Sequence, residues 1–211
     1  KDETTLVLPG GDTRCIFSTS TPFAFQVIPG ASDKVLLYFQ GGGACWDQAS
    51  TDAGFCTSSC SPQSPVGIFD RTESVNNYKD YTIVHVMYCS GDLFGGDIVR
   101  DYLDDAGQPV VQKGYANGLS AVNWIQQQQA TGALASTLSD LVVMGCSAGS
   151  IGAQIWADNS LNMIKWKQAA VIPDSYAGVF PDGSQGPLIY GFGMCSVGKD
   201  FLSPENYQRC V

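Results

Sequence analysis

The pentapeptide GCSAG at residues 145–149 constrains the fold of this 211-residue chain more than any other feature. It has the pattern G-x-S-x-G, directly follows the apolar run LVVM at 141–144 and directly precedes a helical pattern at 148–158. Between a strand and a helix, such a turn presents its serine, here Ser147, at the helix N-terminus beside backbone N–H groups without partners. An ordinary Gly/Ser-rich turn is the alternative for the pentapeptide alone, but this context predicts a nucleophile elbow.

Apolar runs alternate with helical patterns along the chain. The runs expected as strands are 35–39 (VLLYF), 82–88 (TIVHVMY), 141–145 (LVVMG) and 169–172 (AAVI). Nearly continuous apolar runs of this length are typical of buried parallel strands. Helices are expected at 117–129, where apolar residues recur at helical spacing, and at 148–158. Because parallel strands need crossover connections, this order predicts a three-layer α/β/α fold, a mostly parallel sheet with helices on both faces.

Size and composition indicate a single domain over residues 1–211. Hydrophobic residues make up 44% and charged residues 15%, a balance that argues against disorder. No apolar run approaches the roughly 20 residues that cross a bilayer, so we expect no membrane span. The net charge of −9 disfavours nucleic acid and anionic membrane surfaces as partners, and it counts mildly against a polyanionic substrate.

Eight cysteines and a single histidine limit the metal and redox chemistry of the chain. Three residues separate Cys56 from Cys60, but one histidine leaves few partners for a zinc site, and we expect neither metal nor cofactor. Disulfides are the better interpretation. They predict an oxidising compartment and therefore a secreted, extracellular protein.

The pairing of the cysteines stays open at this point, because eight cysteines allow about 105 connectivities. Cys89 and Cys146 follow predicted strands that we expect to be neighbours, which makes a bridge between them possible. Cys195 and Cys210 could close a local loop near the end of the chain. The segment 44–65, rich in Cys, Ser, Asp and Pro, is expected to be a disulfide-tied loop.

A second glycine-rich segment, QGGGACW at residues 40–46, follows the first predicted strand. Acyl transfer develops negative charge on a carbonyl oxygen, and preorganised N–H donors aimed at that oxygen are among the largest catalytic effects. Glycines let the backbone approach a substrate closely, and Ala148, the residue after the nucleophile, would supply another donor. A triple glycine alone is usually a turn. Together with the predicted elbow, it predicts an oxyanion loop.

Several longer blocks of the sequence resemble one enzyme family. The blocks at 35–47 (VLLYFQGGGACWD), 67–92 (GIFDRTESVNNYKDYTIVHVMYCSGD) and 141–150 (LVVMGCSAGS) are similar, in this order, to the pectin acetylesterase/Notum family of carboxylesterases. The segment 171–180 (VIPDSYAGVF) resembles that family's segment after the elbow helix. The resemblance covers about residues 14–180.

The resemblance implies a fold, a reaction and a set of site residues. The fold is that of an α/β hydrolase, and Ser147 is the nucleophile. The oxyanion donors are Gly42, Gly43 and Ala148. The reaction is hydrolysis of esters, such as acetyl groups on a polysaccharide or an acyl group on a protein, without a metal.

The histidine that would activate the serine is missing. A serine hydroxyl is a weak nucleophile that needs a base, and in α/β hydrolases the chain order is Ser, acid, His. No histidine follows Ser147; the only one, His85, lies inside the run 82–88, where we expect a structural role. Family members are generally longer. We therefore expect this chain to lack the C-terminal part of the domain, with a C-terminal segment or a second chain supplying the histidine.

Four further residues are candidates because of their positions. Asp174 follows the strand after the elbow helix and is a candidate triad acid, although the resemblance places the family's triad acid further downstream. Asp92, at another strand end, is expected to line the pocket and to hold a loop near the site. Trp46 and Tyr88 are expected to line the pocket mouth, with a place in the core as the alternative for either.

Two functions remain open from the sequence. The first is a secreted serine carboxylesterase whose substrate is an acylated glycan or a small acyl ester. The second is a catalytically inactive extracellular binding or structural protein on the same fold, which lacks the catalytic histidine.

Overall fold

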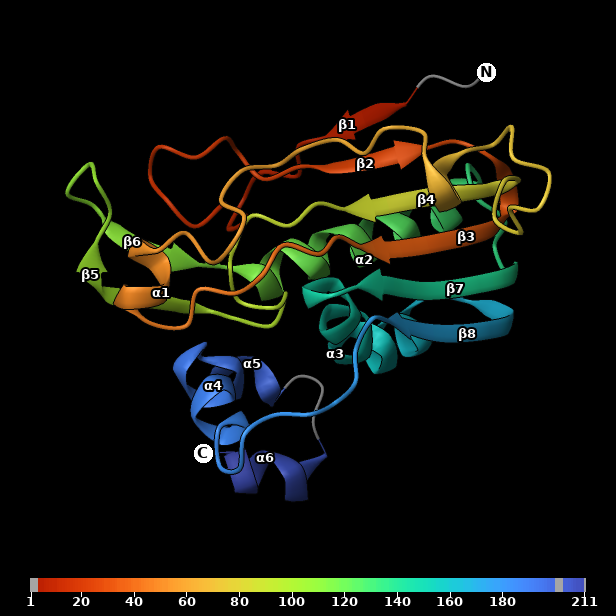
Figure 1. Cartoon of the computed structure of the whole chain (residues 1–211). Coiled ribbons are helices and arrows are strands. Elements are labelled where there is room, and N and C mark those ends of the chain that lie inside the picture. Colours follow the sequence, from red (N-terminus) through yellow and green to blue (C-terminus); the bar gives the residue numbers. More distant parts are fainter. Residues whose placement is uncertain (1–3, 200–202, 211) are drawn as a thin grey trace.

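A mixed six-stranded sheet forms the centre of the computed structural model, which describes residues 4–199 and 203–210 (Figure 1). The strand order is β1-β2-β4-β3-β7-β8. The strands are β1 (Thr5–Val7), β2 (Phe25–Ile28), β3 (Ala31–Phe39), β4 (Tyr81–Val86), β7 (Leu138–Cys146) and β8 (Trp166–Asp174). The four from β4 to β8 run parallel, whereas β1 and β2 pair antiparallel at one edge. This arrangement confirms the prediction of an α/β fold with a mostly parallel sheet.

The helices and a hairpin complete the fold. The helical elements are α1 (Gln48–Asp52), the 3₁₀ helix η1 (Gly67–Phe69), α2 (Gly114–Thr131), α3 (Ala148–Met163), α4 (Gln185–Gly191), α5 (Met194–Gly198) and α6 (Pro204–Cys210). The hairpin pairs β5 (Ile98–Leu103) with β6 (Pro109–Gln112). Both predicted helices exist as α2 and α3, and both are longer than expected. Helix α2 ends where Gly132 adopts the left-handed conformation, with φ of 80°.

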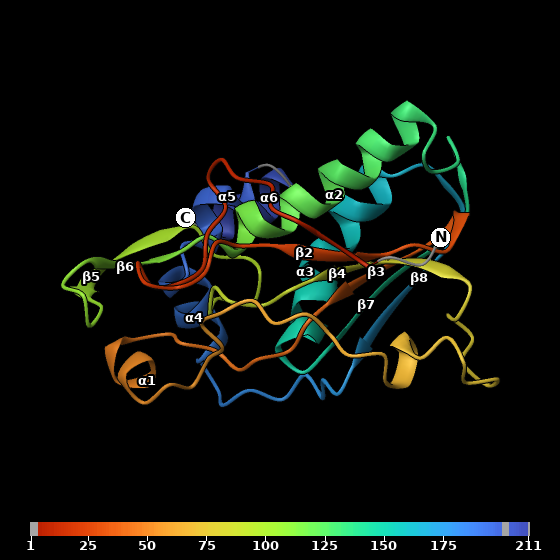
Figure 2. The same ribbon diagram turned by 90° about the horizontal axis from the view of Figure 1, so that it is seen from above.

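The two faces of the sheet are covered unequally. On β3, Val35, Leu37 and Phe39 pack into one apolar cluster that contains residues of both α2 and α3. The alternate residue Leu36 faces the other way, into a smaller cluster that includes Phe69 of η1. Figure 2 shows α2 on one side of the sheet and the short yellow turn of η1 on the other. Among the described residues, the two long helices therefore share one face, unlike the expected arrangement with helices on both.

The carboxyl ends of the parallel strands point to one edge of the sheet. Figure 1 shows α1, the β5–β6 hairpin and α4 to α6 gathered beyond this edge. In open α/β sheets, functional groups collect at this edge because the loops that follow the strands meet there. No helix among the described residues is long and apolar enough to cross a membrane.

Three disulfides link described residues: Cys15–Cys89, Cys45–Cys56 and Cys195–Cys210. The possible Cys195–Cys210 bridge is thus confirmed. The possible bridge between Cys89 and Cys146 is not formed. Cys89 follows β4 and Cys146 ends β7, and β3 lies between these two strands. Cys146 is not in a disulfide, and its Sγ lies 3.6 Å from the Ser175 Oγ.

Candidate active site

Ser147 occupies a sharp turn between β7 and α3. Its backbone has φ of 57° and ψ of −123°, and the residue is exposed at the N-cap of α3. A non-glycine residue at positive φ is uncommon and costs conformational energy, so its surroundings must hold it there. One restraint is the Ser147 N–H, which donates to the carbonyl oxygen of Asp174 at 3.2 Å. The predicted strand, serine turn and helix are therefore all present.

Glycine is required on both sides of the serine. A Cβ at Gly145 would collide with the carbonyl oxygen of Gly149, and a Cβ at Gly149 would collide with the carbonyl oxygen of Phe39. These obstacles are backbone atoms, which cannot rotate away as a side chain can. The start of α3 can therefore pack directly onto the ends of β3 and β7 only with glycine at both positions.

The glycine-rich loop passes directly against the serine turn. A Cβ at Gly41 would lie 2.6 Å from the Cys146 carbonyl oxygen and 3.2 Å from the Ser147 Cβ. The prediction from sequence singled out Gly42 and Gly43 but not Gly41, because only the tertiary structure shows which glycine contacts the serine. A signal was present in the sequence, since Gly41 is the first glycine after the β3 strand.

Two backbone amides of the loop have no acceptor, although the loop around them is held in place. In the described parts of the chain, the N–H groups of Gly42 and Gly43 donate no hydrogen bond. The Gly42 carbonyl accepts from Thr57 N–H at 2.8 Å, and the Cys45–Cys56 disulfide closes the same loop. Ala148 is the first residue of α3, so its N–H has no acceptor within the helix. Such amides suit an anionic oxygen.

A strained turn after β4 forms a second wall near the site. Leu93 and Phe94 both have positive φ, at 60° and 64°. Tyr88 is fully buried, and its hydroxyl accepts from the Leu93 N–H at 2.9 Å. Asp92 accepts from the Phe94 N–H at 3.3 Å. Tyr88 and Asp92 thus hold the turn from behind.

Asp92 is a buried carboxylate inside this turn. It accepts from the Ser90 hydroxyl at 2.6 Å and from the Gly114 N–H at 2.7 Å. Burial raises the pKa of Asp92 to about 6, against the opposing effect of these hydrogen bonds. The absence of a side chain at Gly114 makes room for the carboxylate, since a Cβ there would collide with it. Its contacts are those of a group that holds a loop.

An open cavity of about 700 Å³ lies between α3 and helices α4 to α6. Its apolar lining consists mainly of Leu93, Ile151, Ile155, Tyr176, Phe180, Leu188, Ile189, Phe192 and Met194. Ile151 lies one helical turn after Ser147, whereas Ser147, Ala148 and the glycines at 41–43 are not part of the lining. None of Trp46, Tyr88 and Asp92 is part of this lining. Trp46 instead lies 42% exposed against Phe55, with ring centroids 6.0 Å apart.

His85 lies in the core, as predicted. It is completely buried in β4, with its Nδ1 3.1 Å from the Gln26 Oε1 and its ring against Tyr38 and Phe69. Burial lowers its pKa to about 4. Strand β3 separates β4 from β7, so this imidazole is two strands from the serine turn.

Asp174 ends β8 beside the serine turn. Its carbonyl oxygen accepts from Ser147, and its exposed carboxylate accepts from the Ser175 hydroxyl at 3.2 Å. The backbone of Asp174 therefore contacts the serine turn, and its carboxylate is exposed.

The parallel sheet, the serine turn at positive φ and the helix that follows it define an α/β-hydrolase fold. Within that class, the chain belongs to the pectinacetylesterase family, whose model matches residues 12–188. The solved structure of the Wnt deacylase Notum from Drosophila is similar in fold, with a TM-score of 0.58 and 14% sequence identity. That match covers 94% of this chain and 63% of the Notum chain. No curated protein matches the sequence.

Proposed function

We propose that this chain is the nucleophile-bearing part of a carboxylic ester hydrolase. The observation that carries the proposal is Ser147, exposed at φ of 57° with Gly41 packed against it. In this proposal the Ser147 Oγ attacks the ester carbonyl, and the N–H groups of Gly42, Gly43 and Ala148 stabilise the oxyanion. A helix N-terminus and unpartnered amides favour negative charge at that point.

The proton acceptor has to come from elsewhere. Serine attack requires a base, and His85 is buried two strands away from the serine. We propose that a C-terminal segment or a second chain supplies the imidazole, which fits with this chain spanning 63% of the Notum chain. Asp174 is a candidate to orient that imidazole, because its carboxylate is exposed at the same sheet edge.

The cavity beside α3 supports an ester with an apolar acyl group. Its walls are mainly aliphatic and aromatic, and one of them includes Ile151, one helical turn after Ser147 on α3. The net charge of −9 would repel a polyanion such as pectin, so a neutral acylated glycan or another acyl ester is the better substrate class. Membership of the pectinacetylesterase family is compatible with either. The three disulfides support an extracellular location.

A binding or structural protein without catalysis is the second candidate. It is favoured by one observation, that no histidine follows Ser147 in these 211 residues. An oxyanion loop and a serine without a base would retain only weak reactivity.

A fluorophosphonate probe separates the two candidates. We expect the native protein to label at Ser147, Ser147→Ala to lose the label, and Ser196→Ala, at an exposed serine on α5, to label like wild type. Failure of the native full-length protein to label would favour the binding protein.

A panel of p-nitrophenyl esters then tests the acyl group. Ile151→Trp would narrow the cavity at its α3 wall. We expect this variant to lose at least about tenfold in kcat/KM for the octanoate while retaining the acetate activity. Equal losses for both esters would show that the cavity does not bind the acyl group.

A further inference from the structure

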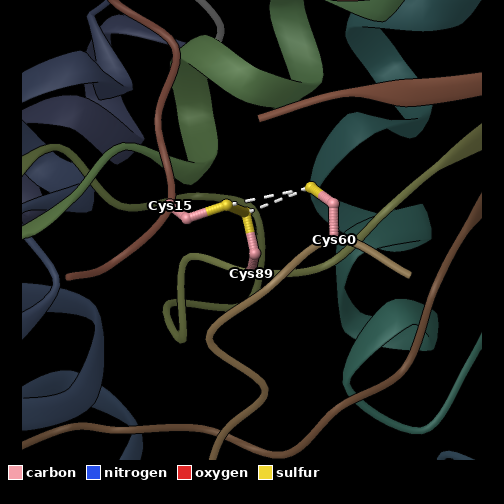
Figure 3. Close-up of side chains that lie close together, drawn as sticks. All are labelled: Cys15, Cys60 and Cys89. Carbon is pink, nitrogen blue, oxygen red and sulfur yellow. Dashed lines mark hydrogen bonds between the residues drawn. A yellow bond between two sulfur atoms is a disulfide. The ribbon is translucent and has the colours of Figure 1, made fainter. Parts of the chain in front are cut away.

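Three cysteine side chains meet just beyond the end of β4. Figure 3 shows the sulfur of Cys60 directed toward the disulfide between Cys15 and Cys89. Cys60 is not in a disulfide, and its Sγ lies 3.5 Å from the Cys89 Sγ and 3.8 Å from the Cys15 Sγ. A disulfide exchanges when a thiolate attacks one of its sulfurs, so proximity of the third sulfur is the first requirement.

We propose that Cys15, Cys60 and Cys89 form a disulfide-exchange site, in which Cys89 can be bonded to either Cys15 or Cys60. In the exchange, the Cys60 thiolate attacks the Cys89 Sγ. A Cys60–Cys89 bond forms, the Cys15–Cys89 bond breaks, and the electron pair leaves with the Cys15 Sγ, which takes up the proton that Cys60 lost. The step has no net oxidation, so it needs no external oxidant or reductant.

Two features of the site slow the exchange that starts from the Cys15–Cys89 form. The nearly equal distances place the Cys60 Sγ beside the disulfide and not on its axis, whereas attack requires three sulfurs close to a line. A side-chain rotation must therefore precede exchange. Burial also raises the pKa of the Cys60 thiol, which keeps the nucleophilic form scarce.

One local contact opposes the effect of burial on the pKa of Cys60, although that pKa stays raised. The Ala24 N–H donates to the Cys60 Sγ at 3.3 Å, which favours the thiolate. The Cys60 N–H also donates to the Thr21 hydroxyl oxygen at 3.4 Å. Cys60 is therefore held next to the disulfide from the side of the N-terminal segment.

Exchange would change which segment is attached to the end of β4. The present bond attaches the N-terminal segment, where the Ile16 N–H also donates to the Cys89 carbonyl at 2.9 Å. A Cys60–Cys89 bond would instead attach the segment that follows Thr57, whose N–H donates to the Gly42 carbonyl. The proposal needs no esterase activity, so it stands or fails independently of the proposed function.

The exchange can be followed by trapping free thiols over time. The full chain carrying Cys146→Ser, which removes the other free cysteine, is incubated without reductant. Samples are quenched in acid, labelled with N-ethylmaleimide in denaturant at low pH, and mapped by mass spectrometry. We expect label on both Cys60 and Cys15, in a ratio that becomes constant once the exchange has reached equilibrium. Label that stays on Cys60 alone would overturn the proposal.

A pair of variants supplies a second test at equilibrium. In oxidising buffer, Cys15→Ser is expected to form a Cys60–Cys89 bond and so to keep three disulfides. The matched variant Cys45→Ser is expected to fall to two disulfides with Cys56 free. A folded Cys15→Ser with free Cys60 and Cys89 would contradict the proposal; should that variant not fold, the time course above decides alone.

Discussion

The backbone N–H of Ser147 donates a hydrogen bond to the carbonyl oxygen of Asp174 across 3.2 Å. This bond joins the turn after β7 to the last residue of β8, its parallel neighbour. Ser147 lies at φ of 57°, which an L-residue adopts at a cost of about 1–3 kcal/mol. The sheet edge therefore restrains the serine turn, and the contacts around it are expected to be sensitive to small changes.

Gly149→Ala is expected to unfold the serine turn. The added methyl would collide with the Phe39 carbonyl oxygen, and neither backbone can move without displacing α3 or β3. We expect a loss of at least about 3 kcal/mol in the free energy of unfolding, measured by urea denaturation. Gly186→Ala in α4 is the matched control, since nothing lies within 4 Å of its added Cβ. A stable Gly149→Ala variant would mean that α3 does not pack this closely.

Tyr88→Phe tests the support of the strained turn. Removing the hydroxyl leaves the Leu93 N–H without the acceptor it has at 2.9 Å. An unsatisfied buried donor costs about 1–3 kcal/mol, so we expect thermal unfolding to begin at a lower temperature. Tyr190→Phe, at a residue that is 75% exposed, removes the same atom without burial and should be neutral. Equal stability of the two variants would contradict the bracing role of Tyr88.

His85→Phe is expected to weaken the fall of the unfolding free energy with decreasing pH below pH 6.5. Burial lowers the pKa of His85 to about 4 in the folded protein, from its ordinary 6.5, so the unfolded chain binds more protons between these values. The stability from the neutral imidazole is present above pH 6.5 and is lost as the pH falls toward 4, by about 3 kcal/mol in total. The Gln26 Oε1 keeps its hydrogen bond from the Gln63 N–H at 2.9 Å, so the variant should be stable at pH 7.

The measurement is the difference in unfolding free energy between His85→Phe and wild type at each pH. The difference removes the opposite contribution of Asp92, whose raised pKa costs stability as the pH rises from about 4 to about 6. As the pH falls from 6.5 toward 4, the unfolding free energy of the variant should decrease less than that of the wild type. Parallel profiles would show that His85 does not titrate with a lowered pKa.

Cys45→Ser is expected to loosen the glycine-rich loop. The Cys45–Cys56 disulfide has a sequence separation of 11 residues. Closing a loop of this size contributes about 3 kcal/mol by restricting the unfolded chain. We expect a stability loss of this order together with slower fluorophosphonate labelling, because Gly42 is held through Thr57, next to Cys56. If the variant is destabilised but labels at an unchanged rate, the disulfide does not set the geometry of this loop.

Local patterns in the sequence were sufficient for the four parallel strands, the two long helices and the serine turn. The run at 35–39 is apolar throughout, as is typical of a strand that is buried on both faces. In the structure, Val35, Leu37 and Phe39 pack on one face of the sheet and Leu36 packs on the other. The turn around Ser147 was predictable because small residues flank it between a strand and a helix. These signals depend on a few consecutive residues, so no tertiary information is needed to recognise them.

Other features depend on residues far apart in the chain. Only the folded structure could show that Cys89 pairs with Cys15 and not with Cys146, because the pairing depends on β3 lying between β4 and β7. The contact of Gly41 with Ser147 and the support of Leu93 by Tyr88 likewise follow from how the sheet edge is assembled.

The sequence by itself determined that a serine would stand on a tight turn between a buried strand and a helix. The tertiary structure decided what surrounds that serine. It brought Gly41 and the Asp174 carbonyl against it. The physical reason is the range of the forces involved: steric limits on φ and ψ act between adjacent residues, whereas hydrogen bonds and packing at a sheet edge join segments that only folding brings together.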